Sequence, residues 1–218
     1  KLLANNQAVV FNSYRTVEPL KSFFTSPVEK TADYFNSPKD VPEIKDKTVV
    51  FGVKNCDLAA HKIQDFVFLE GVDVDSAYRL KREDTILISG DCTKFKAVCH
   101  CLAWGIMPYP AQGFDLNLSP LNEGYLVEIG SWKGEGLIKQ YEEYFVPVRE
   151  AQISARKAKR ENLVERLKNH LAPQNLVNKD NLQQLVRQGW GLDTWQQFMR
   201  TCVECGGCAY VCPTCSCF

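Results

Sequence analysis

The sequence predicts an α/β fold in which an N-terminal sheet domain is followed by a helical segment and a short cysteine-rich end. Two β-branched apolar runs with a helical pattern between them predict a βαβ unit. A charged stretch without proline or glycine begins near residue 149 and predicts a long helix. Six of the ten cysteines lie in the last seventeen residues of the 218-residue chain.

The βαβ unit occupies the middle of the N-terminal domain. The runs TVVFGV (Thr48–Val53) and TILISG (Thr85–Gly90) predict two buried strands. Between them, residues 57–71 predict a helix with Asp57 as its N-cap and Gly71 as its end. A strand, a helix and a strand in this order predict a right-handed crossover, and therefore a parallel pair of strands.

Other parts of the N-terminal domain are expected to complete the sheet and its core. Residues 125–130 (YLVEIG) predict a further strand, and residues 8–11 predict one near the N-terminus. Four aromatic side chains in an irregular layer are expected to pack onto the core: Phe23, Phe24, Tyr34 and Phe35.

The helical segment predicts three helices. Residues 149–171 predict a charged, mostly exposed helix that Pro173 ends, and the stretches DNLQQLVRQGW and DTWQQFMRT predict two shorter ones. The charged face of the long helix favours either exposure to solvent or docking to a partner. A boundary near residue 150 divides the chain into an α/β domain (1–149), a helical linker region (150–200) and a cysteine-rich region (201–218).

Charge and cysteine usage exclude several classes of function. The 26 basic residues balance 26 acidic ones, which argues against binding to nucleic acid. No apolar run approaches the roughly 18 residues of a membrane span, and no export signal is present, which predicts a cytoplasmic protein with reduced thiols. The ten cysteines are then expected to bind metal. No G-x-G-x-x-G loop follows either strand, and three histidines leave little for general-base catalysis, so we expect no catalytic residue.

The cysteine-rich region has the spacing of a bacterial ferredoxin motif. Its run is Cys-x2-Cys-x2-Cys-x3-Cys-Pro, which is typical of binding to a four-iron four-sulfur cluster. Gly206 and Gly207 permit the tight turn that such a cluster requires. Zinc is the alternative, but zinc sites usually place two ligand pairs roughly 12–20 residues apart. The predicted ligands of the cluster irons are Cys202, Cys205, Cys208 and Cys212.

The last cysteines leave the ligand set open. In two-cluster ferredoxins the fourth cysteine of such a run binds the other cluster, so Cys212 serves either this cluster or another one. Cys215 and Cys217 are weaker candidate ligands, and packing is the alternative role for both. Because no second run follows, we expect a ferredoxin-like iron–sulfur region that is truncated at Phe218.

Four other cysteines predict a second site. Cys56 and Cys92 each follow one of the two predicted parallel strands, so both should emerge at the edge where open α/β sheets bind ligands. Cys99 and Cys101 lie a few residues further on. We expect these four thiols to hold a second four-iron cluster, with zinc binding and simple packing as alternatives. Asp57 is a weaker candidate ligand beside its expected capping role.

Five segments carry a resemblance to a known family: GVKNCDLAAHKIQD, YRLKREDTILISGDC, VCHCLAWG, GFDLNLSPLNEGYLVEIGS and CVECGGCAYVCPTCSCF. Together they resemble the iron–sulfur β subunit of cytoplasmic sulfhydrogenases and the related A subunit of anaerobic sulfite reductase. The terminal motif is shared by many ferredoxin-like proteins, but its combination with the CD, DC and CHC elements is more specific. The family usually has Cys-Phe-Cys at residues 99–101, and it continues to a second ferredoxin-type run that this sequence lacks.

The resemblance implies an electron-transfer subunit with two or more four-iron clusters. In such complexes a flavin subunit exchanges electrons with NAD(P), and another subunit carries the catalytic redox centre of a hydrogenase or a sulfite or sulfur reductase. We therefore expect the chain to relay single electrons between these partners in a hetero-oligomer. One alternative is a flavin-dependent oxidoreductase with its own cofactor at the sheet edge. The other is a structural subunit held together by zinc or a cluster.

Overall fold

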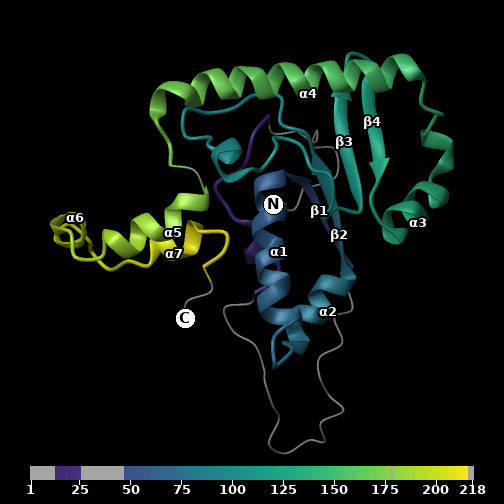
Figure 1. The fold of residues 1–218 in the computed structure, drawn as a ribbon. Coiled ribbons are helices and arrows are strands. Elements are labelled where there is room, and N and C mark those ends of the chain that lie inside the picture. Colours follow the sequence, from purple (N-terminus) through teal and green to yellow (C-terminus); the bar gives the residue numbers. More distant parts are fainter. Residues whose placement is uncertain (1–12, 26–46, 178, 216–218) are drawn as a thin grey trace, which may run out of the picture.

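The computed structural model describes residues 13–25, 47–177 and 179–215 (Figure 1). Within these residues four strands form one sheet in the order β1-β2-β3-β4. The first three strands are parallel, and the fourth is antiparallel to the third. The mixed α/β class is therefore confirmed. The strands are β1 (Thr48–Val53), β2 (Thr85–Gly90), β3 (Leu116–Leu121) and β4 (Gly124–Ile129).

The predicted βαβ unit is confirmed, with two helices in its crossover. These are α1 (Asn55–Leu69) and α2 (Ser76–Asp84), and β1 pairs with β2 in parallel. The helix α1 begins two residues before the predicted start, so the prediction that Asp57 is its N-cap is wrong. Lys54 holds that position, and Asp57 lies in the first turn, where the helix dipole favours a negative charge.

The second half of the sheet is a β-hairpin of β3 and β4. The predicted strand at residues 125–130 is confirmed within one residue as β4, whereas β3 has no counterpart in the prediction. The helix α3 (Trp132–Gln140) follows, and the Ser131 hydroxyl caps it by accepting from the backbone N–H groups of Lys133 and Gly134. Gly134 permits close packing here, because a Cβ atom would collide with the Asp115 carbonyl oxygen.

The hydrophobic core lies between the sheet and the helices α1 and α2. Phe24 is 1% exposed and belongs to it, as predicted, but Phe23 is 44% exposed, so its predicted packing is wrong. Both residues belong to the turn around η1 (Leu20–Phe23), which points only one of the two rings inward. Tyr34, Phe35 and the strand predicted at residues 8–11 lie outside the described residues. The core cluster comprises Leu20, Phe24, Val50, Val53, Leu58, Tyr78, Leu87 and Phe114.

The long charged helix is confirmed as α4 (Glu150–Leu171), and it is docked onto the chain's own sheet. Figure 1 shows it crossing the ends of β3 and β4. Most of its residues are exposed, but Leu163 and Leu167 are buried on the face that packs against the domain. Its charged residues also reach the sheet, since Arg156 pairs with Glu128 at 3.0 Å. One face of this helix is therefore an internal contact, and the opposite face is solvated.

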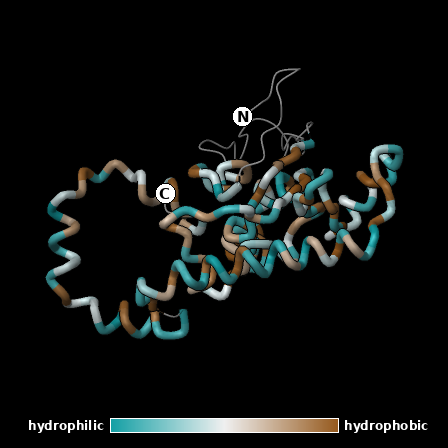
Figure 2. The backbone as a smooth tube through the Cα atoms, turned by 90° about the horizontal axis from the view of Figure 1, so that it is seen from above, coloured by the Kyte–Doolittle hydropathy of each residue, from teal (hydrophilic) through white to brown (hydrophobic). Residues whose placement is uncertain are grey.

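The chain after α4 makes a wide excursion that returns to the sheet domain, as Figure 2 shows. It contains the two predicted shorter helices, α5 (Lys179–Gln188) and α6 (Asp193–Met199), and a third short one, α7 (Gly207–Val211). Hydrogen bonds hold its end against the domain. Lys21 Nζ donates to the carbonyl oxygens of Ala209 at 2.7 Å and Cys215 at 2.6 Å, and the amide of Gln64 on α1 donates to the Pro213 carbonyl at 3.1 Å. The three-part domain division and the ferredoxin-like character of this end stay predictions.

Candidate functional site

The parallel strands bring Cys56 and Cys92 to the same edge of the sheet. Cys56 lies in the first turn of α1, directly after β1, and Cys92 lies two residues after β2. Both residues are half-buried, and burial is the main cause that raises the pKa of each thiol to about 12. The two thiols also interact electrostatically with each other. This is the juxtaposition that the sequence predicts from strand direction alone.

Cys99 and Cys101 join the same group from the loop after β2. Cys101 begins the short helix η2 (Cys101–Trp104), and the Cys99 thiol accepts from the Lys96 backbone N–H at 3.3 Å. Cys92 interacts electrostatically with both, and Cys101 also reaches Cys56. Burial raises the pKa of Cys101, and the neighbouring Cys99 raises it further. The four residues Cys56, Cys92, Cys99 and Cys101 are called the sheet-edge cysteines below.

The chemistry of these donors fits an iron–sulfur cluster. The described cysteines are all free thiols, so none of the four is taken up in a disulfide with another described residue. Over residues 13–25, 47–177 and 179–215, no three His, Cys, Asp or Glu side chains are grouped so as to hold a metal ion. A cubane cluster, however, is a cage that takes one thiolate at each iron corner, and its ligands stand further apart than those of a single zinc ion with Zn–S bonds of about 2.3 Å.

Lys54 lies among these thiols, and its position was not predicted from the sequence. Its side chain is buried, and its Nζ donates to the carbonyl oxygens of Gly90 and Asp91, at 3.1 Å each. Burial lowers its pKa, whereas the nearby Cys92, Asp91 and Cys56 favour its charged form. Lys54 thus places a hydrogen-bonded ammonium group beside the sheet-edge cysteines. The sequence shows a lysine two residues before Cys56, but no sequence pattern indicates that its side chain is directed into the protein.

Asp57 has a partner other than a metal. Its carboxylate is buried and accepts from Arg15 Nε at 2.5 Å. Burial raises the pKa of Asp57, and the Arg15 hydrogen bond and charge act in the opposite direction. This pairing ties the segment around Arg15 to the start of α1. Asp57 therefore has a structural role, the ion pair with Arg15, that competes with the weaker hypothesis of metal binding.

The terminal cysteines lie along a turn and the short helix α7, and they are Cys202, Cys205, Cys208 and Cys212. The first three are exposed and Cys212 is half-buried. Gly206 has a φ of 70° and precedes α7, which matches the predicted need for a tight turn. The Cys212 backbone N–H donates to the Cys208 carbonyl at 3.1 Å, so one turn of α7 links these two cysteines.

Cys212 has close polar neighbours at the end of α7. Partial burial raises the pKa of its thiol, but hydrogen bonds with Cys215 and Thr214 outweigh this effect and lower the pKa to about 7. Cys215 thus lies beside Cys212, which is compatible with either of its predicted roles. Cys217 lies outside the described residues. The assignment of cluster ligands in this region stays a prediction.

The helix α1 connects the two cysteine groups. It carries Cys56 in its first turn and Gln64, which contacts Pro213 next to Cys212, two turns later. Eight residues of an α-helix span about 12 Å along its axis. The contact of Gln64 with Pro213 therefore brings the end of the terminal motif to the helix that carries Cys56.

Among the described residues, no helix combines the length and the apolar character that a crossing of the bilayer requires.

Comparison with known proteins gives one informative match. The chain is 30% identical over 206 residues to the sulfhydrogenase 2 subunit beta of Pyrococcus furiosus, and the match covers 94% of this chain and 58% of that protein. The chain thus spans somewhat more than half the length of this relative. No protein-family model matches, and no solved structure matches. The resemblance to sulfhydrogenase β subunits predicted from the motifs is confirmed.

Proposed function

Starting from this homology to a sulfhydrogenase β subunit, we propose that the chain is an iron–sulfur electron-transfer subunit of an oxidoreductase complex. It would relay single electrons between a flavin- and NAD(P)-linked subunit and a subunit with a catalytic redox centre of the hydrogenase or sulfite or sulfur reductase type. The observation that supports this most is the convergence of Cys56, Cys92 and Cys101 at the sheet edge.

The roles of the residues follow from their positions. The sheet-edge cysteines would hold one four-iron cluster, and the terminal cysteines would hold the other. A four-iron cluster bound by thiolates supplies one-electron redox chemistry at a potential set by its hydrogen bonds, local charge and burial. The protein would contribute by partly burying the sheet-edge thiols and by holding the ammonium group of Lys54 near Cys92 and Cys56.

The docking of the terminal motif supports a relay between the two groups. Lys21 and Gln64 tie the backbone at residues 209–215 to the sheet domain through hydrogen bonds of 2.6 to 3.1 Å. These hydrogen bonds keep the end of the terminal motif near the sheet domain, and electron transfer between two bound centres requires that the centres lie near each other. No acid, base or nucleophile is needed for this function.

The test is EPR spectroscopy of the dithionite-reduced protein, prepared without oxygen. We expect two four-iron signals in the wild type, the loss of one in Cys56→Ala and the loss of the other in Cys205→Ala. Thr93→Ala, which changes the neighbour of Cys92 without removing a thiol, is the matched control and should keep both signals. A Cys56→Ala protein that folds and keeps both signals would remove the sheet-edge site from the proposal.

A further inference from the structure

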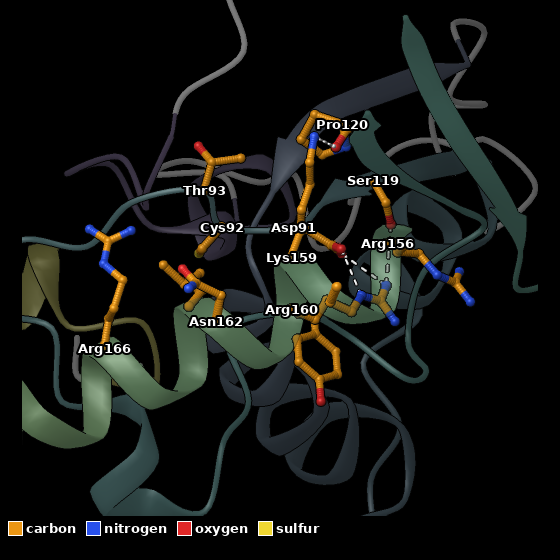
Figure 3. Close-up of a pocket in the computed structure, with 13 residues that line it drawn as sticks. Asp91, Cys92, Thr93, Ser119, Pro120, Arg156, Lys159, Arg160, Asn162 and Arg166 are labelled. Carbon is orange, nitrogen blue, oxygen red and sulfur yellow. Dashed lines mark hydrogen bonds and ion pairs between the residues drawn. The ribbon is translucent and has the colours of Figure 1, made fainter. Parts of the chain in front are cut away.

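A pocket of about 460 Å³ lies between α4 and the carboxyl edge of the sheet (Figure 3). One wall consists of the residues that follow β2, among them Cys92 and Thr93. The end of β3 contributes Ser119 and Pro120, and the remaining wall is a stretch of α4. The pocket thus occupies the place where open α/β sheets usually bind ligands, and it shares Cys92 with the sheet-edge site.

The lining of this pocket is cationic. It contains four basic side chains of α4 and a single carboxylate, that of Asp91. Arg160 takes up this carboxylate with two hydrogen bonds, at 2.7 and 3.0 Å, and lies over the Tyr109 ring at 4.4 Å. Arg156 pairs with Glu128 at 3.0 Å. The four basic residues are Arg156, Lys159, Arg160 and Arg166.

Two of these cations have no countercharge in the described part of the chain. Lys159 Nζ donates to the Pro120 carbonyl at 3.3 Å and to the Asn122 side-chain oxygen at 3.0 Å, both of which are neutral acceptors. The Arg166 guanidinium lies 5.7 Å from the centre of the Phe95 ring, and within residues 47–177 and 179–215 it forms no ion pair. Figure 3 shows Lys159 and Arg166 on two sides of the hollow, with Asn162 between them and Thr93 across from it.

We propose that this pocket binds an oxyanion of the phosphate type, either free or as part of a phosphorylated small molecule. An arginine fork and a lysine ammonium group are the usual donors to phosphate oxygens, and Thr93 and Asn162 provide neutral donors at the same hollow. The volume falls in the range of small-molecule sites, which is about 300–1,000 Å³. This inference goes beyond the proposed function, because it does not depend on either cluster.

The positive charge of the pocket lining has one competing explanation. Four thiolates and an iron–sulfur cluster next to Cys92 would carry negative charge, and the basic side chains of α4 would then offset that charge without binding any ligand. The two explanations differ in one measurable respect, because the competing one predicts that the wild-type protein has no affinity for small oxyanions.

Isothermal titration calorimetry of the full chain, purified without oxygen and in low-salt buffer free of phosphate, tests the proposal. The probes are inorganic phosphate and ADP. We expect saturable binding by the wild type, and binding roughly tenfold weaker in Lys159→Gln and in Arg166→Gln, because each loses a charge-assisted hydrogen bond. Tighter binding of ADP than of phosphate would identify a phosphorylated small molecule as the ligand, and equal binding would identify a free anion.

Lys157→Gln is the matched control. Lys157 lies on the same helix, outside the pocket lining, and its closest carboxylate is that of Glu161 at 4.0 Å. We expect this variant to bind both probes like the wild type. The proposal is overturned if the wild type shows no heat of binding with either probe at millimolar concentration, or if Lys157→Gln weakens binding as much as the two pocket variants do. A change in cluster potential in the pocket variants, without anion binding by the wild type, would likewise overturn it and assign these cations to the cluster.

Discussion

Lys54 places a positive charge next to the thiols of Cys56 and Cys92, in a position shielded from solvent. A nearby cation stabilises the reduced form of a cluster more than the oxidised form, because the reduced form carries one more negative charge. The buried position strengthens this effect, since a low effective dielectric weakens Coulomb interactions less than water does. At the scale of single residues, Lys54 is thus positioned to raise the potential of the cluster proposed at the sheet-edge site.

The first prediction concerns this charge. Lys54→Met should lower the midpoint potential of the cluster bound by the sheet-edge cysteines by roughly 50–100 mV, since about 59 mV corresponds to 1.4 kcal/mol for one electron. Redox titration followed by EPR measures it. Lys62→Met, at an exposed position of the same helix, should leave the potential unchanged. An unaltered potential in Lys54→Met with full iron content would show that Lys54 has only a structural role.

The second prediction concerns His61, which is 3% exposed in the core beside Phe24 and Tyr78. Burial is the main cause that lowers its pKa to about 4; Asp65, 3.7 Å from its Nε2, opposes this and Arg82 adds to it. Because the unfolded chain binds this proton near pH 6.5 and the folded chain near pH 4, stability is full above pH 6.5 and falls as the pH drops toward 4. The loss amounts to about 3 kcal/mol.

Urea unfolding at several pH values checks the effect of His61. In His61→Leu, the free energy of unfolding should decline less between pH 6.5 and pH 4 than it does in the wild type. Phe24→Leu disturbs the same core but removes no titratable group, so its decline should match that of the wild type. Equal declines in His61→Leu and the wild type would contradict the account.

At the scale of elements, α4 packs across the edge of the sheet and stabilises it. Leu167 is 1% exposed and Leu163 is 5% exposed, and both lie on the buried face of this helix, whose other face is charged. Arg160 extends the contact by pairing with the buried Asp91, directly beside Cys92. The helix therefore stabilises the same loop layer that presents the sheet-edge cysteines.

The third prediction tests the packing of α4 against the sheet domain. Leu167→Ala should lower the free energy of unfolding by about 2–5 kcal/mol, because it removes a buried side chain and leaves a cavity. Chemical denaturation measures the change. Leu185→Ala on α5, where the side chain is 45% exposed, should cost far less. A similar small cost for both variants would mean that α4 does not pack as the structure shows.

The fourth prediction concerns the attachment of α7. Lys21 donates to two carbonyl oxygens of the terminal segment, and hydrogen bonds of charged groups contribute about 1.5–3 kcal/mol each. In Lys21→Met, amide hydrogen exchange in residues 207–215 should become roughly 10- to 100-fold faster, while exchange in β2 and β3 stays as in the wild type. Unchanged exchange in residues 207–215 would show that other contacts hold this segment.

Elements with a strong local pattern could be predicted from the sequence. The strands β1 and β2 are continuous apolar runs, and α4 has no helix-breaking residue, so the structure differs from the predictions by at most one residue at their ends. The strand β3 (LNLSPL) alternates apolar residues with Asn117 and Ser119, which are buried and polar. Asn117 accepts from Ser89 and donates to Asp91, and such tertiary hydrogen bonds leave no trace in a local pattern.

The candidate site, like the fold, could be predicted only where a local pattern in the sequence determines it. Strand direction was enough to place Cys56 and Cys92 together, because the carboxyl ends of parallel strands share one edge. The roles of Lys54, Arg160 and Asp57 depend on contacts between segments distant in sequence, and these contacts appear only in the folded chain.

At the scale of the whole molecule, the sheet domain and the terminal motif form two cysteine-bearing parts joined by α4 and brought back together through Lys21 and Gln64. The excursion between them exposes large apolar side chains, including Trp190, which is 79% exposed, and Phe198, which is 74% exposed. The arrangement leaves Cys202, Cys205 and Cys208 exposed, whereas Cys212 and the sheet-edge cysteines are half-buried. In the proposed relay, this difference would give the two cluster sites different accessibility to solvent.

The most direct test of the central claim is the iron and acid-labile sulfide content of the chain after anaerobic expression and purification. The account predicts about eight irons and about eight sulfides per chain, corresponding to two four-iron clusters on the sheet-edge and terminal cysteines. A folded protein that contains zinc, or no metal, in place of iron and sulfide would contradict it.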